Sequence, residues 1–93
     1  MKGLITETIG GESYRYYPLS NHVVQAVGIC GGRPTFKYTR IEITGTLERL
    51  AAGENIDDIV RGYRNRVPHE AVVEAIMLVT SHFMETVPRL EAA

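Results

Sequence analysis

The sequence predicts a single, mainly α domain in which three helices follow an N-terminal β-hairpin or arm. Three observations support this prediction. The chain has 93 residues, which is enough for one hydrophobic core. β-Branched and aromatic residues, interrupted by glycines, are concentrated between residues 14 and 43. Apolar residues then recur at helical spacing from residue 43 to residue 86.

The first half of the chain contains three segments with β propensity. Residues 14–17 are rich in tyrosine, and the segment stops at Pro18, which cannot donate to a strand ladder. Residues 22–27 and 35–43 are expected to pair as a hairpin, because the glycines between them favour a turn.

The second half of the chain carries the helical pattern. The first predicted helix has Thr44 as its N-cap and Gly53 as its C-terminal stop. Asn55 caps a short second helix. Pro68 suits the first turn of a third helix, which we expect to run to about Thr86.

The third predicted helix is apolar around most of its circumference. One apolar face is formed by Val72, Ala75, Ile76, Val79 and Phe83. The polar face is formed by Glu70, Glu74, Ser81 and Glu85. Val73, Met77 and Met84 widen the apolar surface beyond what one small domain needs to cover. We therefore expect a homodimer with these three residues at the interface; the alternative is that the N-terminal arm folds back over the helix.

Two stretches of the sequence resemble a known family. Residues 28–43 read GICGGRPTFKYTRIEI, and residues 47–60 contain LERLAAG followed by NIDDIV. Together they resemble the DUF433 family, whose pattern is approximately GGkPvikGTRIpV followed by a helix that ends in Gly, over about residues 20–80. The resemblance implies a helix-turn-helix fold and an antitoxin-like role of the VapB type, beside a nuclease toxin.

The resemblance also sets the expected domain boundaries. A three-helix helix-turn-helix domain with a β arm would occupy residues 20–86. An N-terminal extension would cover residues 1–19, and a C-terminal tail would cover residues 87–93.

Three positions depart from the family pattern. Tyr38 stands where the family prefers Gly, although Tyr resists a positive φ. Glu42 replaces a Pro, and Arg64 follows Tyr63 where the family has another Pro. These departures predict an arm with a different bend or a different target.

DNA binding would need cations that reach phosphates. Because the third helix has an acidic face, those cations must come from the turn before it and from the arm. The candidate DNA-binding residues are Arg33, Lys37, Arg40, Arg61, Arg64, Arg66 and His69. The alternative is internal ion pairing, with Glu42 or Glu48 as partner of the arm arginines and Asp57 as partner of Arg61.

The sequence carries no catalytic or metal-binding motif. The histidines share no i, i+4 spacing, and the single cysteine, Cys30, makes no CxxC. We therefore expect no enzyme activity, no catalytic residue, no metal and no cofactor. The start has no apolar signal core, and the longest apolar run, 75–79, is too short for a membrane span, so we expect a cytoplasmic protein.

The leading hypothesis is a non-catalytic, dimeric DNA-binding protein of the antitoxin type that represses its own operon and neutralises a toxin. Its partners would be a second copy, duplex DNA and a toxin protein. The net charge is −1, and residues 33–66 hold seven Lys/Arg against five Asp/Glu. The alternative is a dimeric protein–protein interaction module on the same fold that does not bind DNA, which the acidic C-terminal part favours.

Overall fold

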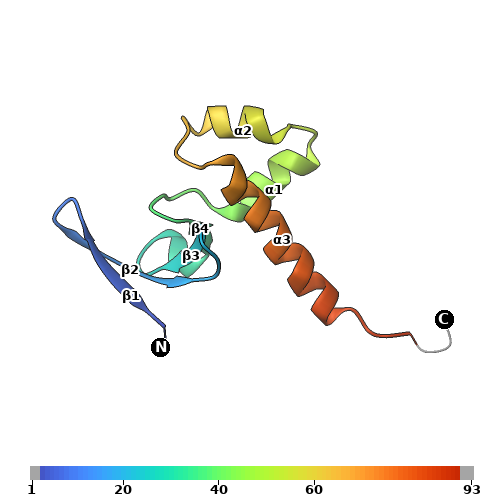
Figure 1. Cartoon of the computed structure of the whole chain (residues 1–93), viewed down its shortest axis with the longest axis horizontal. Helices are drawn as coiled ribbons and strands as arrows, with labels where there is room; N and C mark the ends of the chain where they lie inside the picture. Colours follow the sequence, from blue (N-terminus) through green and yellow to red (C-terminus); the bar gives the residue numbers. More distant parts are fainter. Residues whose placement is uncertain (1–2, 91–93) are drawn as a thin grey trace.

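The computed structural model describes residues 3–90 and has an α+β fold (Figure 1). The strands are β1 (Ile5–Ile9), β2 (Glu12–Pro18), β3 (Val23–Ala26) and β4 (Pro34–Phe36). They form one antiparallel sheet in the order β1-β2-β3-β4. A 3-10 turn, η1 (Cys30–Gly32), separates β3 from β4. The helices are α1 (Ile43–Ala51), α2 (Ile56–Gly62) and α3 (His69–Thr86).

The prediction of a mainly α domain with a hairpin arm is wrong, because the strands form a four-stranded sheet. The β1–β2 hairpin was not among the predicted elements. Its end residues Ile9 and Glu12 pair with each other, and Gly10 and Gly11 between them have φ of 59° and 82°. Two consecutive positive φ angles suit a tight two-residue hairpin turn, and glycine adopts them without steric cost. Both strands fall within the expected extension at 1–19, and β2 pairs onto β3.

β3 and β4 pair with each other across the glycines, with Val23 opposite Phe36. β4 ends at Phe36, whereas the sequence predicted a strand through residue 43. Tyr38 has a φ of 68°, and the Thr39 hydroxyl donates to the Phe36 carbonyl at 2.8 Å. The Phe36 N–H donates to the Ile41 carbonyl at 2.9 Å, so the chain turns back on itself before it enters α1.

The start of α1 also differs from the prediction. Its N-cap is Glu42 and its first residue is Ile43, so the predicted cap Thr44 lies inside the helix. The predicted stop is correct, since Gly53 follows the helix with a φ of 101°.

The ends of α2 and α3 follow the predicted signals. The Asn55 side chain accepts a hydrogen bond of 2.9 Å from the Asp58 N–H, which satisfies a free donor at the start of α2. Pro68 precedes α3, and the helix ends at Thr86. The expected tail at 87–93 is described only to residue 90, and residues 1–2 also lie outside the described part.

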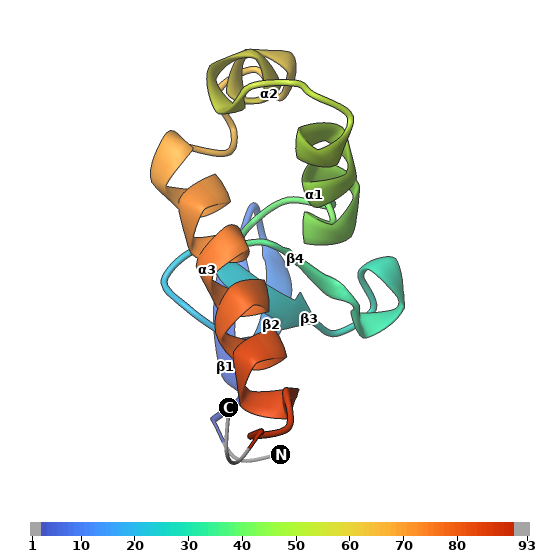
Figure 2. The ribbon, with the colours of Figure 1, turned by 90° about the vertical axis from the view of Figure 1, so that its right-hand side faces the viewer.

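The main core lies between one face of the sheet and the first half of α3 (Figure 2). Its buried residues are Val23, Phe36, Ile43, Val67, Ala71, Val72 and Ala75. A smaller cluster contains Tyr16, Val24 and Ala26. Val23 and Val24 are neighbours on β3, so their side chains point to opposite faces of the sheet. The centre of the sheet is therefore covered on both faces, and α3 is held only at its N-terminal half.

Candidate functional site

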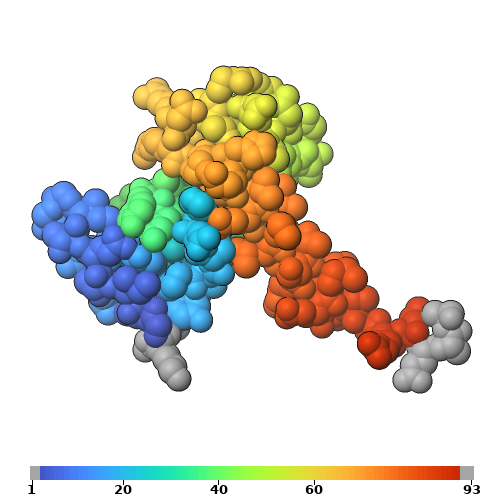
Figure 3. All heavy atoms as spheres, viewed as in Figure 1, coloured from blue at the N-terminus to red at the C-terminus, as the bar shows by residue number. Residues whose placement is uncertain are grey.

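The C-terminal half of α3 extends away from the rest of the molecule (Figure 3). In the first half of this helix Ala71, Val72 and Ala75 are buried. From Val79 onward every described residue is exposed. Val79 and Phe83 follow Ala75 at intervals of four, so they continue the buried stripe past the point where the body ends. Phe83 is 62% exposed although it lies on this stripe.

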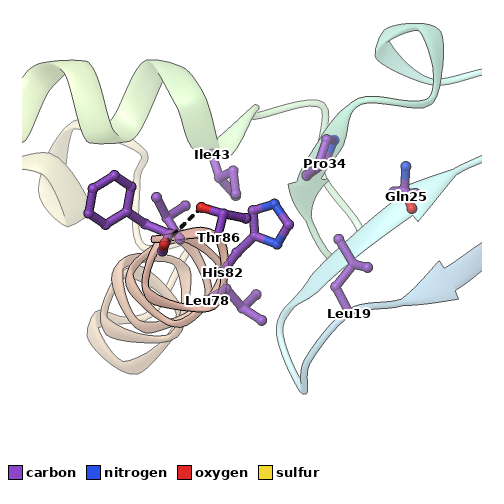
Figure 4. A pocket seen from close by; sticks show the side chains of 9 residues that line it. Leu19, Gln25, Pro34, Ile43, Leu78, His82 and Thr86 are labelled. Carbon is purple, nitrogen blue, oxygen red and sulfur yellow. Dashed lines mark hydrogen bonds between the residues drawn. The ribbon is translucent and has the colours of Figure 1, made fainter. Parts of the chain in front are cut away.

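An apolar groove of about 760 Å³ lies beside this half of α3. Figure 4 shows Leu78 and His82 on α3, with Leu19 and Pro34 across the groove and Ile43 of α1 above it. Among residues 3–90, no side chain fills this groove. The described residues thus leave an apolar surface uncovered between α3, the sheet and α1.

The three predicted interface residues lie on a different strip of α3. Val73 is half-buried, whereas Met77 and Met84 are 62% and 61% exposed. At 100° per residue this strip is separate from the one that holds Val79 and Phe83. The sequence placed Val79 and Phe83 on one apolar face with Val72 and Ala75 and did not name them as interface residues, because periodicity cannot show where the covering body ends.

Four of the seven candidate DNA-binding residues contact side chains that make them less available to DNA phosphates. These neighbours are Glu42 Oε1 at 2.8 Å from Arg33 Nε, Asp58 bound to Arg61, Asp57 at 3.4 Å from His69 Nδ1, and the rings of Tyr16 and Tyr38, each 5.1 Å from Lys37 Nζ. The hydrogen bond from Arg33 lowers the pKa of Glu42. Arg61 binds Asp58, three residues earlier, rather than the expected Asp57.

The other three candidates, Arg40, Arg64 and Arg66, are exposed. Within the described part of the chain, none of them has a carboxylate within 4.0 Å. Arg40 and Arg66 line one groove of about 300 Å³ together with Tyr14 and Tyr38. The structure thus brings one arm arginine and one turn arginine to the same place, although 26 positions separate them in the sequence.

Glu74 does not join the polar face predicted for α3. Its Oε1 accepts hydrogen bonds from the Ser20 hydroxyl at 2.6 Å and the His22 N–H at 2.8 Å, and His22 Nδ1 lies 2.6 Å from Oε2. Burial raises the pKa of Glu74, but the hydrogen bonds from Ser20 and His22 outweigh this effect and lower it. This carboxylate ties α3 to the segment between β2 and β3.

A polar aromatic cluster holds the β1–β2 hairpin against the loop after β4. The Tyr16 hydroxyl donates to Glu7 and lowers the pKa of that carboxyl. The Tyr38 hydroxyl donates to both oxygens of Glu7, at 3.0 and 3.1 Å. This cluster was not predicted from the sequence, because its members come from β1, β2 and the loop after β4.

Across residues 3–90, no three His, Cys, Asp or Glu side chains are grouped closely enough to hold a metal ion. In the same part of the chain, no helix combines the length and apolar character needed to cross a bilayer. The thiol of Cys30 is half-buried and donates to the Arg40 carbonyl at 3.4 Å.

These features define a small α+β protein with a protruding apolar helix and a separate arginine-lined groove. The chain belongs to the DUF433 family, a protein family of unknown function, whose model matches residues 23–77. The match contains β3, β4, α1, α2 and the first half of α3. No curated protein and no solved structure matches the chain.

Proposed function

We propose that this DUF433 protein is a non-catalytic interaction module that dimerises through the protruding half of α3. The observation that carries this proposal is the exposure of Val79 and Phe83 on the stripe that is buried one turn earlier. Their exposure leaves apolar surface in water, and burying it is favourable by about 25 cal/mol per Å². The surface that covers them must therefore come from outside the chain's described residues.

The occupant of this surface is a second copy of the same chain. Each copy carries both an apolar helix end and an apolar groove of about 760 Å³ beside it. A two-fold arrangement lets the two helix ends cover each other's grooves at once, which closes the assembly. Since α3 is one continuous helix to Thr86, its end forms one wall of the groove and does not fill it. A 93-residue chain also buries a smaller share of its surface than a larger domain does, which favours dimerisation.

The oligomeric state tests this proposal. We expect the wild-type protein to sediment as a dimer at micromolar concentration and Phe83→Glu to sediment as a monomer, because a carboxylate cannot be buried unpaired. Ser81→Glu is the matched control, since it adds the same charge to the polar face of the same helix. Phe83 is exposed, so the variant should keep its circular dichroism spectrum. A wild-type monomer at high concentration would overturn the proposal.

Met77→Glu distinguishes between the two apolar strips of α3. The proposal predicts that Met77→Glu weakens the dimer less than Phe83→Glu, because Met77 does not line the large groove. Dissociation by Met77→Glu alone would assign the interface to the strip of Val73, Met77 and Met84.

DNA binding with autorepression is the second candidate function. It is supported by Arg64 and Arg66, which lie between α2 and α3. Both are exposed, and neither forms an ion pair with a carboxylate among the described residues. It is opposed by Glu70 in the first turn of α3 and by the carboxylate partners of Arg33 and Arg61. Toxin neutralisation is a further proposal that rests on the family resemblance alone.

A salt-titrated mobility-shift assay tests this second function. If phosphate contacts carry the binding, affinity for duplex DNA falls steeply with salt. Replacing Arg64 and Arg66 together with Ala should then flatten the slope by about two counterions. Absence of a shift at low salt, with upstream or random duplex, would leave only the interaction module.

A further inference from the structure

The groove of about 300 Å³ lies on a different part of the surface from the apolar groove along α3, because the two share no lining residue. It is bounded by the β1–β2 hairpin, by the loop after β4 and by the turn before α3. Its polar lining includes Arg40, Arg66 and Glu12, and its aromatic lining includes Tyr14 and Tyr38. Because Ile29, between β3 and η1, also lines it, four separate segments of the chain converge on this groove.

The charges of this groove are unbalanced. Elsewhere in residues 3–90, Arg33, Arg49 and Arg61 each bind a carboxylate. Arg40 and Arg66 have no such partner there, even though Glu12 lines the same groove. One carboxylate and two guanidinium groups leave the groove with a net positive charge. A guanidinium group binds phosphate oxygens well, because it can donate two parallel hydrogen bonds to them.

The backbone on both sides of the groove adopts left-handed conformations. Tyr38, two residues before Arg40, has a φ of 68°. Arg64 and Asn65, directly before Arg66, have φ of 55° and 59°. A positive φ is costly for residues such as Tyr38 and Arg64, whereas Asn adopts it readily, and residues strained in this way concentrate at ligand sites. Arg40 and Arg66 lie two residues and one residue after these positions.

One wall of the groove offers aromatic and apolar surface. The rings of Tyr14 and Tyr38 lie 5.4 Å apart between centroids at an angle of 41°, and Ile29 also lines the groove. Tyr38 is 52% exposed, so part of its surface is available to a ligand. A planar base can stack on such a wall.

The geometry points to a nucleotide-binding groove in which Arg40 and Arg66 hold the phosphate and the tyrosine wall takes an unpaired base. A volume of about 300 Å³ is at the lower end of ligand pockets and suits a single nucleotide unit. The nucleotide is either free or part of a single strand. A base inside a duplex is not available to this wall, because it is already stacked and paired.

Calorimetric titration of the full chain at low salt tests this site. The probes are adenosine 5′-monophosphate, inorganic phosphate, a short oligodeoxyadenylate and the duplex of that oligonucleotide. We expect the mononucleotide or the oligodeoxyadenylate to bind, with Arg40→Ala and Arg66→Ala each weakening binding by about tenfold or more. The tighter of the two ligands identifies the source of the nucleotide. Arg89→Ala is the control, since Arg89 is exposed beyond the end of α3, and it should bind like the wild type.

Several results would overturn the proposal. The first two are that neither the mononucleotide nor the oligodeoxyadenylate binds, and that only the duplex binds. The other two are that inorganic phosphate binds as tightly as the nucleotide, and that Arg89→Ala weakens nucleotide binding as much as Arg40→Ala and Arg66→Ala do. Phe83→Glu separates this proposal from dimerisation, because the groove shares no residue with the α3 surface. A monomeric Phe83→Glu protein that still binds the nucleotide supports the groove, whereas loss of nucleotide binding in a folded Phe83→Glu protein contradicts it.

Discussion

The backbone N–H of Tyr38 donates a hydrogen bond of 2.8 Å to the hydroxyl of Tyr14. Tyr38 has a φ of 68°, which costs an L-residue about 1–2 kcal/mol relative to its preferred backbone. Three contacts compensate: this hydrogen bond, the packing of the two rings, and the hydrogen bonds from the Tyr38 hydroxyl to Glu7. The β1–β2 hairpin thus stabilises a loop conformation that would otherwise suit glycine.

Replacing Tyr38 with Gly separates these opposing effects. Glycine removes the backbone strain, and it also removes the ring contact and the bonds to Glu7. We expect the free energy of unfolding to change by less than about 1 kcal/mol, because the two effects are of similar size. Hydrogen exchange in β1 should accelerate, since the hairpin loses its contact with the loop. Native-state exchange measured by mass spectrometry checks both parts.

Tyr38→Phe is the control for this substitution. It keeps the ring and the strained backbone and loses only the exposed hydroxyl bonds to Glu7. Exchange in β1 should therefore accelerate less than in Tyr38→Gly, because the ring contact with Tyr14 remains. If Tyr38→Gly leaves exchange in β1 at the wild-type rate, the hairpin is not anchored through Tyr38.

The parts of the fold that local signals determine could be predicted from the sequence. Asn55 and Gly53 act within one turn of the helices they bound, so the limits of α1 and α2 near them follow from the sequence. The turn at Gly10 and Gly11 is an equally local signal, and counting it would have found the β1–β2 hairpin. The prediction of a mainly α fold was wrong because this turn signal was not used.

The early end of β4 could not be predicted in this way. Residues near Tyr38 have strong β propensity, yet contact with Tyr14, 24 positions away, holds the chain in a turn. Glu74 is similar, because its partner His22 is 52 positions away and no periodic pattern reveals it. For the arm arginines Arg33 and Arg40, the sequence left both Glu42 and Glu48 as carboxylate partners. Only the folded structure shows that Glu42 is the partner of Arg33.

The carboxylate of Glu74 makes stability depend on pH. Its pKa is lowered from an ordinary value of 4.5, so the folded state binds this proton less readily than the unfolded chain. The stabilisation is complete above about pH 4.5 and is lost as the pH falls through the lower pKa of the folded state. We expect Glu74→Gln to be about 1–2 kcal/mol less stable than the wild type at pH 7. This difference should shrink in urea unfolding at pH 3.

Glu85→Gln provides the matched control on the same helix. Glu85 is exposed and makes no ion pair within 4.0 Å in the described chain. Its substitution should change stability by less than about 0.5 kcal/mol at either pH. A stability difference for Glu74→Gln that stays constant from pH 7 to pH 3 would contradict the role of the ionised carboxylate.

For two buried threonines, Thr35 and Thr46, we expect substitution by Val to change the free energy of unfolding in opposite directions. Thr35 Oγ1 is buried and has no hydrogen-bond partner among residues 3–90, whereas the Thr46 hydroxyl lies 2.8 Å from that of Tyr63. Thr35→Val removes an unsatisfied hydroxyl and should raise the free energy of unfolding by about 1 kcal/mol. Thr46→Val breaks the link between α1 and Tyr63 and should lower it by a similar amount. Urea unfolding of the two variants and the wild type at one pH measures both changes. If Thr35→Val is less stable than the wild type, the Thr35 hydroxyl has a hydrogen-bond partner in the folded protein.

Dimerisation through α3 predicts that thermal stability depends on protein concentration. Mass action raises the melting temperature of a dimer as its concentration rises, and a monomer shows no such dependence. The wild-type protein and Ser81→Glu should both show the increase, and Phe83→Glu should not. Differential scanning calorimetry over about a hundredfold range of concentration is sufficient to see it.

Truncation after Thr80 removes most of the protruding half of α3. Every described residue from position 81 onward is exposed, so its loss should lower the stability of the monomer by less than about 1 kcal/mol. The truncated chain should sediment as a monomer at all concentrations, because Phe83 is absent. Its melting temperature should match that of dilute Phe83→Glu. A truncated chain that remains dimeric would place the interface on the body of the protein, and one that unfolds would show that the end of α3 supports the fold itself.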